Sequence, residues 1–354
     1  MNHNEEPLVS VLTPVYNGAA FLAQCIESVL RQTYQNYEYI IVNNCSTDQT
    51  LEIARAYEET DKRVRIHSNT QFVDVISNHN IAFGLISQES KYCKVVSADD
   101  FIFPNCIERM VKCAEGNPSA GFIGSYQLSG SYVRWQGFEY PRALFAGTEV
   151  CRRVFLEGNP RFGFGSPTSL MYRADLVRNS TTFYPNLDPH SDTSACFRDL
   201  QKCDFGFVYE ILSFEKTHAD TQSSKSADLN RYSSGYLNDL IQYGPLFLSE
   251  IELEQKVNER FNAYHRFLAV NFFVGFRGKE FWKYHESRLE ELGRPLKRVT
   301  LLWAAVKAVF QELLNPEQAM RKLLKRLPAK MNEHLPSNGG GVQSRPKDHN
   351  ALSA

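Results

Sequence analysis

Residues 9–18 read Val-Ser-Val-Leu-Thr-Pro-Val-Tyr-Asn-Gly, and this stretch is the first indication of the fold. Its opening four residues have the composition of a short, mostly buried strand. We expect the strand to stop at Pro14, because proline has no backbone N–H to donate to a sheet ladder. Polar residues follow immediately, so the sequence predicts a strand end that carries functional groups.

Strand and helix patterns alternate through the rest of the first hundred residues. Apolar residues at helical spacing predict a helix over 21–30, and Ser46 with Gln49 has the spacing of a capping box for the next helix. The remaining expected strands cover 37–42, 64–67, 92–96 and 205–212, and the remaining expected helices 51–57, 75–85, 250–273 and 296–314. This alternation predicts a Rossmann-related α/β fold, with a mainly parallel sheet flanked by helices and a C-terminal helical extension.

The composition fits an ordinary globular enzyme and argues against nucleic acid as a partner. The 354 residues are 43% hydrophobic and 22% charged, with a formal net charge of -1. We expect three regions, namely a catalytic domain over 1–228, a helical extension over 229–335 and a disordered tail over 336–354. The polar start lacks the apolar core of a secretory signal, and the eight cysteines have no C-x-x-C spacing. A cytoplasmic location is therefore predicted.

The ends of the predicted strands carry the polar groups of greatest interest, because ligands of such sheets bind there. The turn after residue 12 has no G-x-G-x-x-G pattern, and the chain has no Walker A loop, so a bound phosphate needs another source of positive charge. Asp99 and Asp100 follow a strand directly and could hold a hard divalent cation. Taken alone, the pair is better interpreted as a cap for the next helix, near Pro104.

Four ordered blocks resemble the family 2 glycosyltransferases, which have the GT-A fold. They are residues 9–18, residues 27–34 (Glu-Ser-Val-Leu-Arg-Gln-Thr-Tyr), residues 40–48 (Ile-Ile-Val-Asn-Asn-Cys-Ser-Thr-Asp) and residues 97–100 (Ser-Ala-Asp-Asp). The resemblance implies an inverting, metal-assisted transfer of a sugar from a UDP- or dTDP-linked donor to a glycan or lipid-linked acceptor. Bacterial surface polysaccharide synthesis is the commonest setting of the family.

The resemblance also assigns roles in the first half of the chain. Asp99 falls on the family's position for Mg²⁺ or Mn²⁺, with Asp100 beside it. Residues expected to bind the nucleotide-sugar are Pro14, Tyr16, Asn17, Asn43, Asn44, His79, Asn80 and Asp100. For His79, a solvent-facing helix position is an equally good interpretation. Two positions depart from the family pattern, because Asn43 and Ser97 stand where relatives commonly have aspartate.

In the second half, the resemblance requires a carboxylate that takes the proton from the acceptor hydroxyl. Asp192, at the start of a predicted helix, is the candidate base; a helix N-cap is the alternative role, and Asp188 is the nearest rival. His218 is a candidate metal ligand, with no functional role as the equal alternative. Residues 163–168, Gly-Phe-Gly-Ser-Pro-Thr, resemble a loop near the acceptor site.

Residues 294–330 are rich in Lys and Arg and carry one apolar helical face. Such a helix could make peripheral contact with the inner face of a membrane, although packing on the catalytic domain is the favoured interpretation. Two other functions are alternatives for the chain. A non-catalytic nucleotide-sugar-binding or scaffold protein would explain the loss of acid at Asn43 and Ser97. A nucleotidyltransferase is disfavoured because the first turn lacks a glycine- and lysine-rich loop.

Overall fold

The computed structural model describes residues 6–157, 162–185, 190–216, 229, 231–274, 277–297, 299, 301, 303 and 306. The chain divides into two compact units, one formed by residues 1–264 and 277–296 and the other by 265–276 and 297–354. The boundary predicted after residue 228 does not coincide with the edge of a compact unit, and the three-domain division stays a prediction. The first unit contains the sheet and every predicted site residue that the structure describes.

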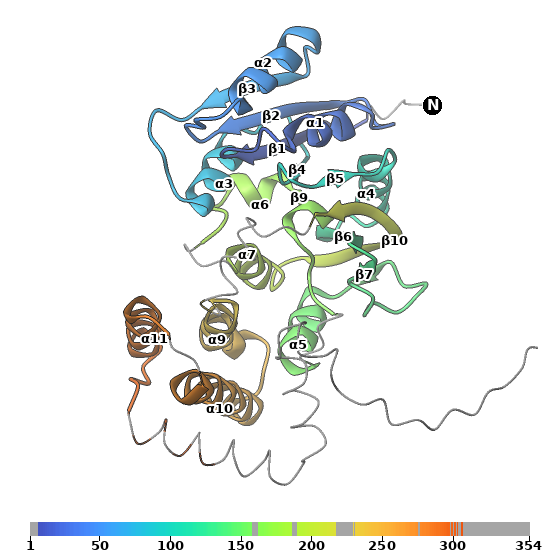
Figure 1. Ribbon diagram of the computed structural model, residues 1–354. Coiled ribbons are helices and arrows are strands. Elements are labelled where there is room, and N and C mark those ends of the chain that lie inside the picture. Colours follow the sequence, from blue (N-terminus) through green and yellow to red (C-terminus); the bar gives the residue numbers. More distant parts are fainter. Residues whose placement is uncertain are drawn as a thin grey trace, which may run out of the picture. The chain divides into compact units, whose positions relative to one another are not determined.

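The described residues of the first unit contain one large mixed sheet (Figure 1), in the order β3-β2-β1-β4-β9-β6-β10-β5. Neighbours from β3 to β4 are parallel, as are β6 and β10, while β9 runs antiparallel between β4 and β6. The mainly parallel sheet predicted from the sequence is therefore confirmed. The strands are β1 Val9–Val15, β2 Tyr37–Asn43, β3 Val64–Ser68, β4 Tyr92–Val95, β5 Phe101–Ile102, β6 Ala120–Ser129, β7 Tyr132–Arg134, β8 Leu144–Phe145, β9 Leu170–Arg173 and β10 Asp204–Glu215.

Helices cover both faces of this sheet, because successive residues of a strand point to opposite sides. Val11 of β1 packs in a core with α1 and α4, whereas its neighbour Leu12 packs in a second core with α3, α5 and α7. The helices are α1 Leu22–Leu30, α2 Thr50–Thr60, α3 Val75–Gly84, α4 Cys106–Gly116, α5 Gly147–Glu157, α6 Ala174–Arg178, α7 Ser191–Asp199, α9 Arg231–Tyr243, α10 Glu250–Val274 and α11 Lys279–Glu291. Within the described ranges, none is long and apolar enough to cross a bilayer.

Strand β1 differs from the prediction, since it runs through Pro14 to Val15. The Leu12 carbonyl accepts a hydrogen bond from Val96, so Leu12 directs its backbone groups toward β4. Backbone direction alternates along a strand, so Pro14 also faces the β4 side. The pairing of β1 with β4 ends at Leu12, while pairing with β2 continues to Val15. The missing N–H of Pro14 therefore costs no ladder hydrogen bond.

The predicted capping box is wrong, and so is the alternative role of the acidic pair as a helix cap. Ser46 and Gln49 form no capping box, because Asp48 accepts the hydrogen bonds of the Thr50 amide and hydroxyl at the start of α2. Asp99 and Asp100 do not cap a helix either. The short strand β5 follows them, and α4 begins only at Cys106. The acidic pair therefore lies in a connection between two strands.

The helical segment after β10 has a buried ionisable group at the contact between α10 and α11. His285 on α11 is fully buried, and its Nδ1 lies 2.6 Å from the Tyr264 hydroxyl on α10. Burial, with a smaller contribution from Arg277, lowers the pKa of His285 from 6.5 to about 4. In the folded protein this imidazole therefore stays neutral between about pH 4 and pH 6.5, a pH range in which it would be protonated in the unfolded chain.

We expect acidification from pH 7 to pH 4 to destabilise the protein through His285. In that window the unfolded state binds the extra proton, so the penalty grows as pH falls and reaches at most about 3 kcal/mol. Urea unfolding at several pH values measures it. His285→Gln should flatten this part of the pH dependence. Tyr264→Phe, which removes the hydrogen bond but keeps the burial, should lower stability without changing the slope. An unaltered slope in His285→Gln would contradict the assignment.

Candidate active site

The turns that follow β1 and β2 are joined by hydrogen bonds between their side chains and backbones. The Asn17 side-chain oxygen accepts from the Thr47 amide at 2.8 Å, and the Asn17 amide donates to the Ser46 hydroxyl at 3.0 Å. Asn17 has a φ of 49°, a conformation that asparagine tolerates better than most residues. Asn17 therefore holds the two turns together, and its predicted contact with the nucleotide stays a prediction.

Asn43 and Tyr16 lie beside these two joined turns and differ in their exposure to solvent. Asn43 is the last residue of β2 and is buried, with its side-chain oxygen accepting from the Ser46 amide at 3.2 Å. Tyr16 comes directly after β1 and is 47% exposed. Pro14 lies two residues earlier, at the end where β1 has no β4 partner. The predicted nucleobase residues thus lie together at the carboxyl ends of β1 and β2.

Asn44 acts on the loop after β3. Its amide nitrogen donates to the Val73 carbonyl at 2.8 Å, and its oxygen accepts from the Val73 amide at 3.0 Å. The same oxygen accepts from the side chain of Asn69 at 3.0 Å. With its amide committed to the loop, Asn44 is expected to support the nucleotide site by fixing this segment; direct contact with the base stays a prediction.

The loop held by Asn44 presents Phe72, a residue that the sequence patterns did not single out. Phe72 is 61% exposed, and its ring meets that of Tyr16 edge to face with centroids 4.8 Å apart. Two exposed aromatic rings at the end of a strand offer a surface on which a planar ligand can stack. The only sequence signal was one phenylalanine in the otherwise polar run 69–72, and periodicity gives it no role.

Asp100 is the buried member of the acidic pair. It is 6% exposed; one carboxylate oxygen accepts from the Thr168 hydroxyl at 2.6 Å and the other from the Lys216 amide at 3.0 Å. Burial first, and then the neighbouring charge of Asp99, raises the pKa of Asp100 from 3.8 to about 7. Ionised Asp100 is therefore destabilised by its surroundings, as expected of a site that takes a cation.

Lys94 holds the segment that carries Thr168. This lysine on β4 is fully buried, and its ammonium donates to the carbonyls of Thr168 at 2.6 Å and Leu170 at 3.1 Å. Burial lowers its pKa. These two hydrogen bonds hold residues 163–168, the loop that resembles an acceptor loop, next to Asp100. Nothing in the sequence pattern distinguished Lys94 from an ordinary strand residue.

Asp99 and Asp100 fit a hard divalent cation through their carboxylate oxygens. Asp99, half-buried, comes after the Ser97 turn, in which the Asp100 amide donates to the Ser97 carbonyl at 2.9 Å. Over the part of the chain that the structure describes, no group of three or more His, Cys, Asp or Glu residues could hold a metal. His218, the other predicted ligand, lies outside the described residues, as does Asp188.

Asp192 is the second residue of α7, so the N-cap alternative is wrong, since His190 occupies the capping position. Its carboxylate accepts from the Thr193 amide at 2.8 Å and is half-buried. The pKa values of Tyr172 and Tyr184 are raised mainly by burial and further by the charge of Asp192. Asp192 therefore lies near these tyrosines.

His79 and Asn80 lie on α3 and contact the segment that leads to α7. The Asn80 amide nitrogen donates to the Tyr184 carbonyl, and its oxygen accepts from the Tyr184 amide, both at 2.9 Å. His79 stacks on the Tyr184 ring with centroids 5.5 Å apart, and its Nδ1 lies 2.8 Å from the Val75 carbonyl. Both residues support the neighbourhood of Asp192; their contact with a diphosphate stays a prediction.

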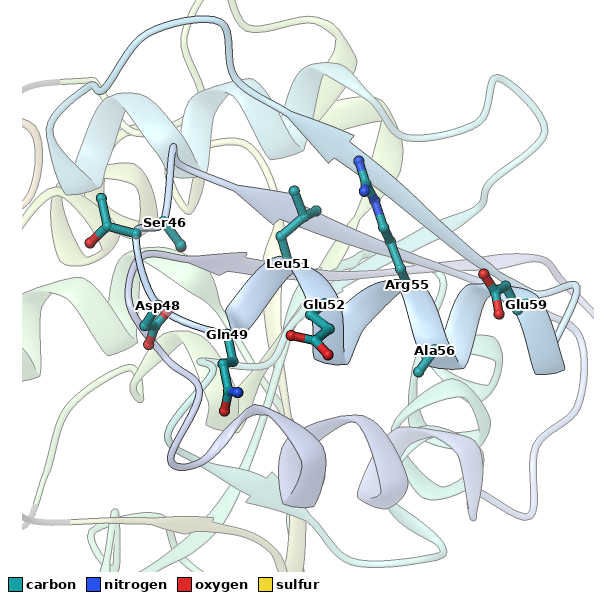
Figure 2. Close-up of a pocket in the computed structure, with 9 residues that line it drawn as sticks. Ser46, Asp48, Gln49, Leu51, Glu52, Arg55, Ala56 and Glu59 are labelled. Atoms are coloured by element: carbon teal, nitrogen blue, oxygen red, sulfur yellow. The ribbon is translucent and has the colours of Figure 1, made fainter.

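An open groove of about 760 Å³ runs along the start and outer side of α2 (Figure 2). Polar and charged side chains dominate its lining, and none of the residues predicted to bind the donor or metal takes part. The lining residues are Ser46, Thr47, Asp48, Gln49, Leu51, Glu52, Arg55, Ala56 and Glu59. The groove therefore lies next to the turns that Asn17 joins, but it is not the site predicted from the sequence.

Comparisons with known proteins identify the family of the chain. The family described as glycosyl transferase family 2 matches residues 10–179. The uncharacterized glycosyltransferase RP339 of Rickettsia prowazekii (strain Madrid E) is 38% identical over 279 residues, which cover 75% of this chain and 85% of that protein. The chain belongs to glycosyltransferase family 2.

Other relatives match this family 2 chain over a shorter stretch. An uncharacterized glycosyltransferase of Haemophilus influenzae is 38% identical over 120 residues, and GlyG of Streptococcus pneumoniae serotype 4 is 34% identical over 119. These stretches cover 34% of this chain and only 36% and 39% of those proteins. The part shared with both of them is thus about a third of each chain.

Solved structures establish the GT-A-like fold of this family 2 chain. S. aureus TarS 1–349 superposes with a TM-score of 0.56 at 16% identity, covering 80% of this chain and 79% of TarS 1–349. The mannosyltransferase PcManGT from Pyrobaculum calidifontis gives a TM-score of 0.51 at 14% identity, covering 90% and 84%. At such identities the likeness speaks for the fold alone.

We expect Asp100→Asn to stabilise the metal-free protein at alkaline pH. Because the pKa of Asp100 is raised, the free energy of unfolding of the protein falls as pH rises from about 4 to about 7. The full loss, up to about 4 kcal/mol, is present at pH 8. The variant removes it, whereas both proteins should be equally stable near pH 3.5. Urea unfolding in EDTA at the two pH values measures the difference. A variant that is less stable than wild type at pH 8 would refute a destabilising charge on Asp100.

Proposed function

We propose that this chain is an inverting glycosyltransferase that moves a sugar from a UDP- or dTDP-linked donor to a glycan or lipid-linked acceptor. One observation carries the proposal. The carboxyl ends of β1, β2 and β4 gather an aromatic pair, buried amides and an acidic pair with one raised pKa along one edge of a parallel sheet. A nucleoside suits the aromatic pair and the amides, and a metal-bound diphosphate suits the acidic pair.

The nucleobase would lie against Tyr16 and Phe72, near the Asn43 amide. Exposed aromatic rings stack on a base of any kind, while an amide oxygen accepts a hydrogen bond from a base N–H without adding charge. Among structural neighbours, TarS 1–349 was solved with UDP-GlcNAc and PcManGT with GDP-Man and Mn²⁺. Those ligands support a nucleotide-sugar as the class of donor.

Asp99 and Asp100 would hold Mg²⁺ or Mn²⁺, with Asp99 as the principal ligand and His218 as a further one. The bound cation supplies positive charge to the diphosphate leaving group. Thr168 and the Lys216 amide hold Asp100 in place by hydrogen bonds to both of its oxygens. This support keeps one carboxylate fixed and leaves the role of direct ligand mainly to Asp99.

Asp192 would take the proton of the acceptor hydroxyl as that oxygen attacks the anomeric carbon. A single displacement inverts the anomeric centre and needs one base on the acceptor side. The loop over 163–168 reaches Asp100 through Thr168, so the acceptor would enter between this loop and α7. The proposed setting is the cytoplasmic synthesis of a surface polysaccharide. Contact of the basic region 294–330 with a membrane stays the less favoured alternative, and most of that region lies outside the described residues.

Two variants separate binding from chemistry. We expect Asp192→Asn to bind the donor normally while turnover falls about 10²- to 10⁴-fold, because only the proton transfer is lost. Asp99→Ala should lose the dependence of nucleotide affinity on Mn²⁺. A hydrolysis screen over UDP-, dTDP- and GDP-sugars selects the donor, and calorimetry measures affinity. Wild-type turnover in Asp192→Asn would remove it from the mechanism, and no metal-dependent nucleotide binding by the wild type would favour the non-catalytic alternative.

Phe72→Ala should weaken nucleotide binding about 3- to 10-fold, the usual worth of an aromatic contact. The loss should be the same for UDP and UMP, since the ring contacts the base and not the diphosphate. Calorimetric titration with both nucleotides tests this. Tyr132→Ala is a matched control, because Tyr132 is 76% exposed on β7 and outside the site. Equal affinities in Phe72→Ala and wild type would exclude the aromatic pair from the base site.

A further inference from the structure

A fully buried carboxylate on α9 lies against the first turn of the helix that carries Asp192. Asp239 is 0% exposed, and its Oδ1 accepts from the Ser194 hydroxyl at 2.5 Å. Its Oδ2 lies 3.9 Å from Nδ1 of His190, the residue that precedes α7. Burying a polar group is costly unless it is hydrogen-bonded, so this position is not explained by packing alone.

The contacts between α7 and α9 fix the position of α7 along its length. His190 meets the Tyr232 ring edge to face at 5.1 Å, Ser194 bonds to Asp239, and Phe197 stacks on Tyr243 at 6.1 Å. The partners follow the same order in both helices. Residues three and four apart share one helical face, so this side of α7 is committed to α9. Asp239 is the polar contact in the middle.

Asp192 lies on a different side of α7. It is two residues before Ser194, which places the two side chains about 200° apart around the helix axis. The side of α7 that carries Asp192 is therefore turned away from the side that contacts α9. A rotation or shift of α7 relative to α9 would therefore move Asp192 by a comparable amount toward or away from the reacting atoms.

The first turn of α7 is coupled internally as well. The His190 carbonyl accepts from the Ser194 amide at 2.8 Å and from the Ser194 hydroxyl at 3.1 Å. Ser194 thus connects the start of the helix to Asp239. Since Asp192 lies between His190 and Ser194 in the sequence, any loosening of this turn reaches the proposed base directly.

We propose that Asp239 is a positioning residue for the acceptor-side base, so that helix α9 completes the active site without touching substrate. The inference rests on the proposed function of Asp192. Asp239 holds Ser194 by a hydrogen bond, with His190 3.9 Å from its other oxygen, and Asp192 is thereby fixed in the orientation needed for proton transfer. A misplacement of a catalytic group by about 1 Å can cost two orders of magnitude in rate, so a contact of this kind is visible in kcat.

The test compares Asp239→Ala, Ser194→Ala and the double variant in turnover of the donor chosen by the hydrolysis screen. We expect kcat to fall at least about 10-fold in each single variant, and the double variant to be no worse than Asp239→Ala, because both remove the same contact. Affinity and binding stoichiometry for that donor's nucleoside diphosphate with Mn²⁺ should stay at wild-type values. Asp239→Asn keeps an acceptor for Ser194 and should recover part of the loss.

Tyr243→Phe is the matched control, because it keeps the ring against Phe197 on the same face of α9. A loss of activity that follows a reduced binding stoichiometry would show that Asp239 only supports folding, and would overturn the inference. So would wild-type kcat in both Ser194→Ala and Asp239→Asn, even if Asp239→Ala did not fold. If Asp192→Asn is inactive while Asp239→Ala is fully active, only the positioning role fails; if Asp192→Asn is active, the base assignment fails first.

Discussion

The buried ammonium of Lys94 is the interaction on which the arrangement of the site depends. The antiparallel pairing of β4 with β9 ends at Cys93 and Tyr172, and beyond it the two strands separate. Lys94 bridges the separation by donating to the carbonyls of Thr168, just before β9, and of Leu170, the first residue of β9. Desolvation lowers its pKa, yet the bonds hold the segment with Thr168 against Asp100. The segment 163–168 and the parallel strands β1 to β4 are thus joined beside the acidic pair.

Much of the fold could be predicted because periodicity and turn chemistry report local structure directly. The strands over 37–42 and 64–67 and the helices over 21–30 and 75–85 appear where expected. The errors come from tertiary context. Pro14 is tolerated inside β1 because the neighbouring strand has ended, and Asp48 replaces the expected capping box because it also accepts from the Ala19 amide of the adjacent turn.

The sequence predicted which residues belong to the candidate site, but it did not predict which side chains contact one another. Family resemblance located Asn44 and Asn80, whereas the structure shows both amides bonded to backbone groups of distant segments. Such long-range pairing leaves no trace in spacing. Phe72 and Asp239 were missed for the same reason, since one matters through the ring of Tyr16 and the other through Ser194.

The early end of β4 leaves β1 with one open edge inside the sheet, from Thr13 to Val15. An open edge ordinarily attracts another backbone, which would fill the space with protein. Pro14 offers no donor on that side, so the gap demands no partner strand. At this position β1 therefore presents an acceptor and no donor toward β4, because proline keeps its carbonyl and lacks only the N–H.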